Sequence, residues 1–152
     1  MRALFDVSFL IALIDPEHVF HEAAQDWWAA NRQHGWASCP ITENGVCRIL
    51  ASHRYRGMPA ATVDYVAQRI TIFRDGTDHA FWSDRLSLLD RSVFDLSGLY
   101  SSKHLTDIYL LGLAVENAGR LVTFDRGIKR SSVPGARTEH LMAVNTAGTW
   151  DR

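Results

Sequence analysis

The sequence predicts an α/β protein with a central parallel β-sheet flanked by α-helices on both faces. Short apolar stretches of the length of buried strands recur along the 152-residue chain, and segments with helical periodicity lie between them. Neighbouring parallel strands need such long crossover connections, and strands buried on both faces are apolar throughout. These observations place the chain in the α/β class.

Four apolar stretches predict the strands, and each is bordered by residues typical of turns or helix caps. They comprise residues 3–5, 36–39, 121–124 and 141–144. The middle of the chain, residues 75–99, predicts irregular structure with one helix near residues 83–91 and a short strand around Phe81.

Helices are predicted where apolar residues share one face. The faces comprise Phe20, Ala23, Ala24, Trp27 and Trp28; Val63, Val66, Ala67 and Ile70; and Leu110, Leu111, Ala114 and Ala118. Another helix is expected over residues 41–53, and Gly119 is the expected C-cap of the helix over residues 104–118. The aromatic residues of the first face are expected to pack in the core, with a contact to a partner as the alternative.

Composition and length predict one globular domain over residues 1–152, with residues 145–152 as a C-terminal tail. The chain is 47% hydrophobic and 22% charged, and its formal net charge is −1, so any binding of nucleic acid must be local. The longest apolar run, residues 9–14, is far shorter than the ~20 residues of a membrane span, and no membrane association is expected. Cys39 and Cys47 match no zinc spacing, which fits a reducing cytoplasm.

Four acidic residues fall where a parallel sheet gathers its ligands. Asp6 and Asp125 follow predicted strands, whereas Glu43 and Asp107 lie in the first turns of predicted helices. In open parallel sheets, ligands bind beyond the carboxyl ends of the strands, and the following helices begin at the same edge. We call this the carboxyl edge, and we expect the four acids to meet there.

Helical spacing and charge repulsion together predict what the four acids bind. Glu43 is in line with Val46 and Leu50, and Asp107 is in line with Leu110 and Ala114, so both acids are expected to point inward. Four clustered carboxylates cost on the order of 10 kcal/mol without compensation. Oxygen ligands select hard cations, so Mg²⁺ or Mn²⁺ is the expected counter-charge.

Each of these acids, taken alone, also has an ordinary structural explanation. Asp6 and Asp107 are suited to helix N-termini, Glu43 to the helix dipole and Asp125 to a turn. Four such coincidences at one edge favour a metal site instead. His18 and His21, spaced i, i+3, are a weaker candidate pair for zinc, because no third ligand lies nearby in the sequence.

The sequence resembles the PIN-domain ribonucleases, and among them the VapC-type toxins of bacterial toxin–antitoxin pairs. Four segments carry the resemblance, in the family's order and at its usual separations. They are Leu-Phe-Asp-Val-Ser-Phe-Leu-Ile at residues 4–11, Cys-Pro-Ile-Thr-Glu-Asn-Gly at 39–45, Leu-Thr-Asp-Ile-Tyr-Leu-Leu-Gly-Leu-Ala at 105–114, and Arg-Leu-Val-Thr-Phe-Asp-Arg-Gly at 120–127.

This resemblance implies a PIN-like fold and a Mg²⁺- or Mn²⁺-dependent endoribonuclease that is usually a homodimer and is inhibited by an antitoxin protein. The family's metal-site acids fall on Asp6, Glu43, Asp107 and Asp125, and its small hydroxyl residue falls on Ser8. Two departures, Ile108 in place of alanine and Gly112 inside a helix, lie away from the expected chemistry.

Phosphodiester hydrolysis needs an activated water and a stabilised leaving group, and carboxylate-bound divalent cations supply both. Asp6, Glu43 and Asp107 are expected to hold the principal ion, while Asp125 completes its coordination or holds a second ion. The hydroxyls of Ser8 and Thr106 are expected to orient these acids.

Four basic residues near the acids in sequence are candidates for binding the RNA backbone. They are Lys103, Arg126, Lys129 and Arg130. Solvated surface charge is an equally acceptable interpretation of these side chains.

Two other functions remain to be separated from the nuclease. A metal-dependent phosphatase or phospho-receiver domain also places an aspartate after its first strand, but the phosphatase pattern wants a second aspartate where this chain has Ser8. A degenerate PIN-like module that only binds protein is the non-catalytic alternative, and the presence of all four acids argues against it.

Overall fold

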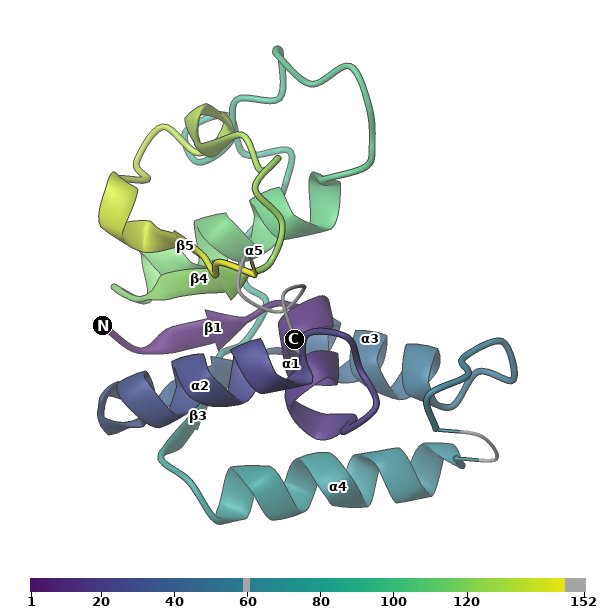
Figure 1. Cartoon of the computed structure of the whole chain (residues 1–152). Helices are drawn as coiled ribbons and strands as arrows, with labels where there is room; N and C mark the ends of the chain where they lie inside the picture. The colour runs from purple at the N-terminus through teal and green to yellow at the C-terminus, as the bar shows by residue number, and fades with distance from the viewer. Residues whose placement is uncertain (59–60, 147–152) are drawn as a thin grey trace.

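The computed structural model describes residues 1–58 and 61–146, and its centre is one sheet of parallel strands (Figure 1). The strands are β1 (Ala3–Phe5), β2 (Trp36–Ser38), β3 (His79–Phe81), β4 (Arg120–Thr123) and β5 (Leu141–Ala143). Their order across the sheet is β3-β2-β1-β4-β5, and every neighbouring pair is parallel. The predicted α/β class and parallel sheet are confirmed, as is the short strand at Phe81.

The helices divide into two groups, one on each side of the core. They are α1 (Val7–Ile14), α2 (His21–Asn31), α3 (Pro40–Leu50), α4 (Val63–Asp75) and α5 (Leu105–Glu116), with short 3-10 turns at Arg32–His34, Arg130–Ser132 and Thr138–His140. In Figure 1, α1 to α4 occupy the lower part of the molecule, whereas α5 and the yellow-green C-terminal segments occupy the upper part. Among the described residues, no helix is both long and apolar enough to cross a membrane.

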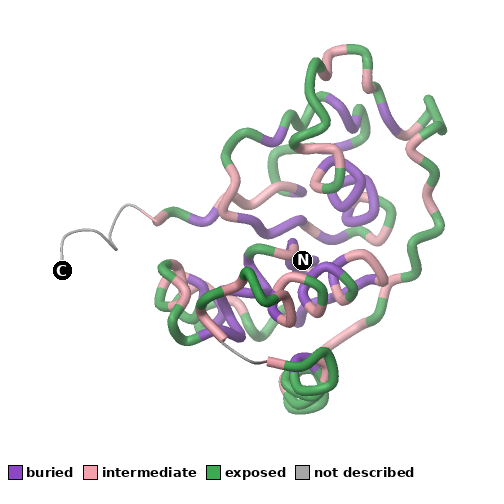
Figure 2. The backbone as a smooth tube through the Cα atoms, turned by 90° about the vertical axis from the view of Figure 1, so that its right-hand side faces the viewer, coloured by how far each residue is buried: buried purple, intermediate pink, exposed green. Residues whose placement is uncertain are grey.

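Alternate residues of the central strands enter two separate cores. Phe5 and Trp36 pack with α1 to α4, while Leu4, Ala37 and Leu121 pack with α5. This is the two-residue alternation of a strand, and it buries both faces of the sheet. Figure 2 shows the consequence, with buried backbone through the centre and exposed residues on the outer helices and loops.

Local capping fixes where the helices at the carboxyl edge begin. The Asp6 side chain accepts a hydrogen bond from the Phe9 backbone N–H at 2.7 Å and so starts α1. At the start of α3, Thr42 Oγ1 accepts a hydrogen bond from the Cys39 N–H at 3.0 Å, and Pro40 occupies the first turn. These caps satisfy backbone donors that the helices themselves leave unpaired.

Two glycines allow neighbouring segments to approach closely. A Cβ on Gly45 would lie 2.7 Å from Val7 Cγ2, so glycine lets α3 pack directly on α1. A Cβ on Gly112 would lie 2.5 Å from Phe94 Cε1, so the glycine inside α5 makes room for that ring. Glycine at position 112 lowers the stability of the helix by about 1 kcal/mol relative to alanine, and the packing of Phe94 against α5 offsets this cost.

The structure corrects the predicted C-cap of α5 and leaves the predicted C-terminal tail untested. Helix α5 ends through Ala118, which adopts a φ of 53°, so the left-handed residue precedes Gly119 instead of being Gly119. Gly119 is needed for space, because a Cβ there would lie 2.7 Å from the Arg2 carbonyl oxygen. Of the predicted tail, residues 147–152 lie outside the described part of the chain.

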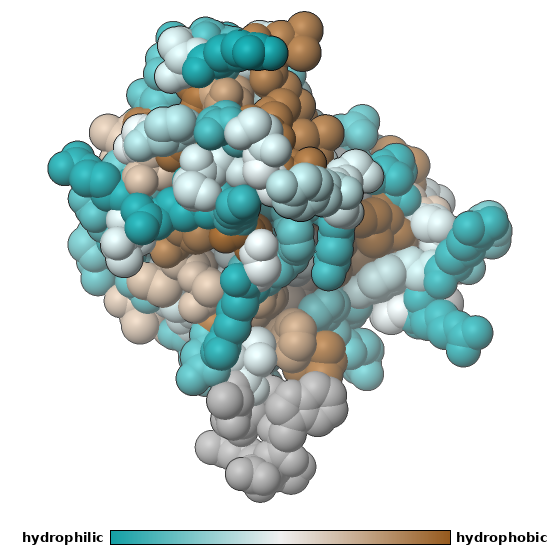
Figure 3. All heavy atoms as spheres, turned by 90° about the horizontal axis from the view of Figure 1, so that it is seen from above, coloured by the Kyte–Doolittle hydropathy of each residue, from teal (hydrophilic) through white to brown (hydrophobic). Residues whose placement is uncertain are grey.

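The predicted helix near residues 83–91 was wrong, and the chain between β3 and α5 runs without one. Aspartate side chains compete for the backbone in this segment, since Asp90 accepts from the Ser92 N–H and Asp95 accepts from the Ser97 N–H. Such Asx turns oppose helix continuation. Phe94 still packs against α5, and the face seen in Figure 3 is largely hydrophilic with separate hydrophobic patches.

Candidate metal centre

The topology brings Asp6 and Asp125 to the place where the strand order reverses. The chain crosses from β1 to β2 and β3 on one side and returns to β4 on the other side of β1. Asp6 follows β1 directly, and its backbone N–H donates to the Val122 carbonyl of β4 at 3.1 Å. Ligands of open parallel sheets bind at such a reversal, beyond the carboxyl ends of the strands.

Asp6 is the most deeply buried acid of the predicted set, with 3% of its surface exposed. Burial raises its pKa from the usual 3.8 to about 6, against hydrogen bonds from Thr123, Phe9 and Ser8, and the nearby Asp107 carboxylate raises it further. The Ser8 hydroxyl donates to Asp6 Oδ1 at 3.0 Å. The carboxylate is therefore held in place but is short of positive charge.

Asp107 and Asp125 face each other across the carboxyl edge. Asp107 lies in the first turn of α5, and burial followed by the charge of Asp125 raises its pKa. Asp125 Oδ1 accepts from the Gly127 N–H at 2.7 Å, which fixes its side chain beyond β4. Two like charges in this arrangement repel each other, so the pair gains from a proton or a cation between them.

His104 joins these two acids and was missed by the sequence analysis. One potential ligand atom from each of His104, Asp107 and Asp125 lies within 4.8 Å of the others. His104 Nδ1 is 3.1 Å from Asp125 Oδ2, yet this buried nitrogen has no hydrogen bond of acceptable geometry among the described residues. Its position three residues before Asp107 at a helix start was the available signal, because residues i and i+3 share a helix face.

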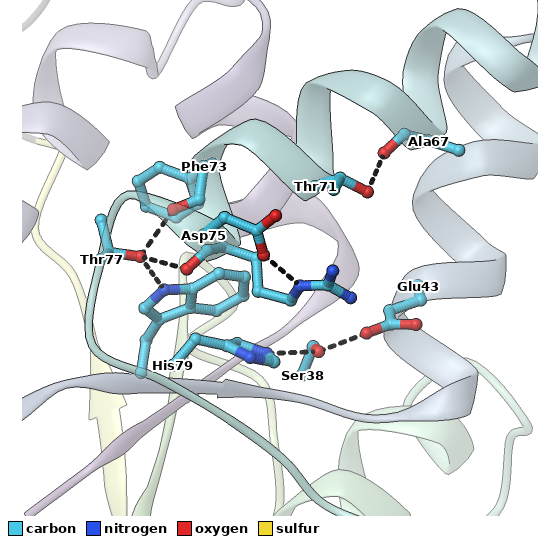
Figure 4. Close-up of polar contacts among 10 residues, drawn as sticks. Ser38, Glu43, Ala67, Thr71, Phe73, Asp75, Thr77 and His79 are labelled. Carbon is cyan, nitrogen blue, oxygen red and sulfur yellow. Dashed lines mark hydrogen bonds and ion pairs between the residues drawn. The ribbon is translucent and has the colours of Figure 1, made fainter.

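Glu43 lies at the same edge but outside this close group. It is in the first turn of α3, and its Oε1 accepts from the Ser38 hydroxyl at 2.5 Å. Figure 4 shows the Ser38 hydroxyl between the Glu43 carboxylate and the ring of His79, whose Nε2 is 2.8 Å from Ser38 Oγ. The structure thus couples Asp6, Asp107 and Asp125, and it places Glu43 in a separate hydrogen-bonded arrangement.

The residues present fit a hard divalent cation. Among the described residues, none of the four acids forms an ion pair with lysine or arginine, and the one basic side chain beside them is His104, whose Nδ1 lies 3.1 Å from Asp125 Oδ2. The N-termini of α1, α3 and α5 offset part of the acids' charge, at about 0.3–1 kcal/mol per helix. Carboxylate oxygens select Mg²⁺ or Mn²⁺, and the imidazole of His104 is compatible with Mn²⁺ more than with Mg²⁺.

Three of the four predicted RNA-binding cations have partners of their own. Arg126 donates to Asn145 Oδ1 at 2.7 Å, Lys129 to the Gly98 carbonyl at 3.1 Å, and Arg130 to the Ala136 carbonyl at 3.0 Å. Lys103 is exposed in the turn that precedes α5, four residues before Asp107 in the sequence.

Thr106 is exposed and lines a cavity of about 340 Å³ with Ile41 and Tyr109. No hydrogen bond joins its hydroxyl to the four acids within the described residues.

A family model described as the PIN domain matches residues 3–133. This range contains β1 to β4, all five helices and all four acids. The chain belongs to the PIN domain family. The four acids, His104 and the Ser38–Glu43 contact therefore all lie within the PIN domain.

Curated relatives of this PIN domain come from Mycobacterium tuberculosis. Ribonuclease VapC44 is 48% identical over 146 residues, which is 95% of this chain and 100% of the relative. Ribonuclease VapC39 is 37% identical over 135 residues, 89% of this chain and 96% of the relative. Ribonuclease VapC38 is 37% identical over 127 residues, 83% of this chain and 86% of the relative.

Proposed function

We propose that this chain is a metal-dependent endoribonuclease and the toxin of a VapBC-type toxin–antitoxin pair. The observation that carries the proposal is its 48% identity to Ribonuclease VapC44 over the whole length of that relative. The acids at the carboxyl edge supply the chemistry that phosphodiester cleavage needs.

Asp6, Glu43 and Asp107 hold the principal ion in this proposal, directly or through water, and Asp125 completes its coordination or holds a second ion. A bound Mg²⁺ or Mn²⁺ lowers the pKa of a water and offsets charge on the phosphate. Asp6 is ionised above about pH 6 and keeps its orientation through Phe9 and Ser8. The carboxylates of Asp107 and Asp125 repel each other, and a bound cation would reduce that repulsion.

The substrate is the backbone of RNA, which the protein must bind locally because its net charge is −1. Lys103, Arg126, Lys129 and Arg130 are the proposed phosphate contacts. Lys103 is exposed in the turn that precedes α5, four residues before Asp107. The hydrogen bonds of Lys129 and Arg130 to loop carbonyls support an additional role in holding those loops.

An antitoxin protein and a second copy of the chain are the proposed partners, and the cytoplasm is the proposed compartment. Both cysteines are free, with Cys39 buried, as a reducing compartment allows. Light scattering on the purified protein measures the oligomeric state, and a monomer at micromolar concentration contradicts the homodimer.

The decisive experiment compares RNA cleavage by the wild type with cleavage by Asp6→Asn and Asp107→Asn. We expect each variant to lose activity by at least about 100-fold in Mg²⁺ or Mn²⁺, because each removes a charged ligand. Asp26→Asn, at an exposed position of α2, is the matched control and should retain full activity. Undiminished cleavage by both site variants contradicts the proposal.

Calorimetric titration with Mn²⁺ separates the nuclease from the non-catalytic module. A nuclease binds Mn²⁺ and loses that binding in Asp107→Asn, whereas a module without a metal site gives no saturable heat. A phosphatase is distinguished by turnover of a phosphate monoester in place of RNA.

A further inference from the structure

Ser38 is a buried hydroxyl residue at the carboxyl end of β2, with 1% of its surface exposed. Its Oγ makes two short contacts, at 2.5 Å to Glu43 Oε1 and at 2.8 Å to His79 Nε2. These three side chains come from β2, α3 and β3, and they lie in one line in Figure 4. Which of these atoms carry a hydrogen follows from the donors and acceptors that the three side chains offer.

Hydrogen-bond counting assigns those hydrogens. An ionised glutamate only accepts, and a serine hydroxyl has one hydrogen to give, so Ser38 donates to Glu43. The lone pairs of Ser38 Oγ then receive the hydrogen that His79 carries on Nε2. Burial lowers the pKa of the His79 imidazole. Because Ser38 donates its only hydrogen to Glu43, the 2.8 Å contact is a hydrogen bond when His79 carries a hydrogen on Nε2.

The His79 ring is held by the sheet and by an aromatic neighbour. His79 is paired with Trp36 in the register of β3 on β2, and the two ring centroids are 4.5 Å apart. Trp36 is fully buried, so it offers a rigid surface to the imidazole. Trp36 and Ser38 are two residues apart on one strand and thus face the same side of the sheet.

A serine beside a histidine and a glutamate also invites comparison with a hydrolytic triad, which the order of contacts excludes. In a triad the histidine lies between the serine and the acid, so that it can take the serine proton. In this PIN domain the serine lies in the middle and donates a hydrogen bond to the acid. Ser38 is also inaccessible to a substrate at 1% exposure.

We propose that Ser38 and His79 are positioning residues that hold Glu43 Oε1, so that Glu43 Oε2 is presented to the metal ion. Within the described residues, hydrogen bonds to this carboxylate reach Oε1 and not Oε2. A relay of two donors polarises each successive bond and fixes the carboxylate plane. The inference rests on the proposed function, since it assigns a role within the same metal site.

Manganese affinity, read from the electron paramagnetic resonance signal of free Mn²⁺, tests the relay without measuring cleavage. Ser38→Ala should raise the Mn²⁺ dissociation constant about 10- to 100-fold, which is the usual effect of removing a partner of a metal ligand. His79→Leu should raise it roughly threefold to tenfold, because one donor of the relay remains. His79→Gln, whose amide can donate from a similar position, should restore most of the affinity.

Thr77→Val is the matched control for damage to this edge of the sheet. Thr77 Oγ1 accepts from Trp36 Nε1 at 2.8 Å and donates to the Phe73 carbonyl at 2.6 Å, so the variant loses partly buried hydrogen bonds beside His79 but keeps both contacts of Ser38. We expect its Mn²⁺ affinity to equal that of the wild type. Equal losses in Thr77→Val and Ser38→Ala, with His79→Gln no better than His79→Leu, would overturn the positioning role.

A double-mutant cycle with Glu43→Gln separates failure of the relay from failure of the metal site. If Ser38 acts through Glu43, Ser38→Ala changes the Mn²⁺ affinity of Glu43→Gln protein by less than about twofold. Mn²⁺ affinity that is lost in Glu43→Gln but unchanged in Ser38→Ala and His79→Leu refutes the relay alone. Affinity unchanged in Glu43→Gln itself refutes the assignment of Glu43 to the metal site.

Discussion

The two sides of the acidic site hold their carboxylates by different means. On the α3 side, Glu43 accepts a hydrogen bond from Ser38, which is in turn contacted by His79. On the α5 side, Asp107 and Asp125 oppose each other, and their neighbour His104 lacks a well-aligned hydrogen bond for its Nδ1. The protein itself supplies a hydrogen-bond donor to the carboxylate on the α3 side, whereas the two carboxylates on the α5 side repel each other.

The two sides therefore contribute differently to metal binding, one by orienting a carboxylate and the other by supplying negative charge. A carboxylate fixed by uncharged donors keeps its direction whether or not a cation is present, and it contributes orientation. Opposed carboxylates raise the free energy of the folded protein until a proton or a cation reduces their repulsion, and they contribute binding energy. Perturbing either side should therefore weaken metal binding, through lost orientation on the α3 side and through lost charge on the α5 side.

The largest expected effect is stabilisation by metal that depends on the α5 side. At a Mn²⁺ concentration 100 times its dissociation constant, the free energy of unfolding should rise by about 2.7 kcal/mol. Chemical denaturation in Mn²⁺ and in EDTA measures this gain for the wild type and for Asp107→Asn. The gain should disappear in Asp107→Asn. An equal gain in both proteins would contradict the assignment of metal binding to the α5 side.

The next effect concerns the buried charge of Asp6 in metal-free protein. Folding raises its pKa from 3.8 to about 6, so its contribution to stability is fully present below about pH 4 and is lost as the pH rises through 6. Asp6→Asn removes the charge but keeps a good N-cap, so it should stabilise the protein by about 2 kcal/mol at pH 8.

Urea denaturation in EDTA at pH 4, 6 and 8 measures this difference in unfolding free energy. The advantage of Asp6→Asn should shrink toward zero near pH 4, where Asp6 of the folded wild type is already protonated. A gain that is the same at pH 4 and pH 8 would mean that the charge is not its cause. Asp26→Asn on the surface of α2 should show no such trend.

The smallest effect expected is at His104, which lies beside the opposed acids without carrying their charge. His104→Ala should weaken Mn²⁺ binding roughly threefold to tenfold, as expected for a neighbour that orients a ligand or supplies a weak one. His34→Ala, at an exposed position, is the control. A loss of Mn²⁺ affinity as large as that of Asp107→Asn would contradict this minor role and would make His104 a principal ligand.

Several parts of the fold could be predicted because their causes are local. The apolar stretches at residues 3–5 and 36–39 correspond to β1 and β2, since short runs of buried residues bounded by caps have few other uses in a chain of this kind. Helix α1 (Val7–Ile14) was not predicted, although its start follows from the local cap at Asp6, and α3 begins at Pro40, one residue before the predicted start. The helix expected near residues 83–91 failed because turn-forming aspartates competed with a weak apolar pattern.

The placement of the four acids in the fold was predictable to the same depth. Placing acids after strands and at helix starts required only their positions in the sequence, and the coupling of Asp6 with Asp107 and of Asp107 with Asp125 follows from that placement. The contact between Ser38 and His79 joins residues 41 apart, on strands whose pairing no local pattern states. Nothing in the sequence around His79 marks it as a partner of β2.

The sequence by itself determined the α/β class, the membership of each acid in a strand end or helix start, and the excess of negative charge at one edge. Only the tertiary structure decided that Glu43 is tied to Ser38 while Asp107 faces Asp125 and His104. The reason is physical: composition and periodicity fix which side chains are buried and on which face, but the partner of a buried polar atom depends on ångström-scale packing between elements distant in the chain.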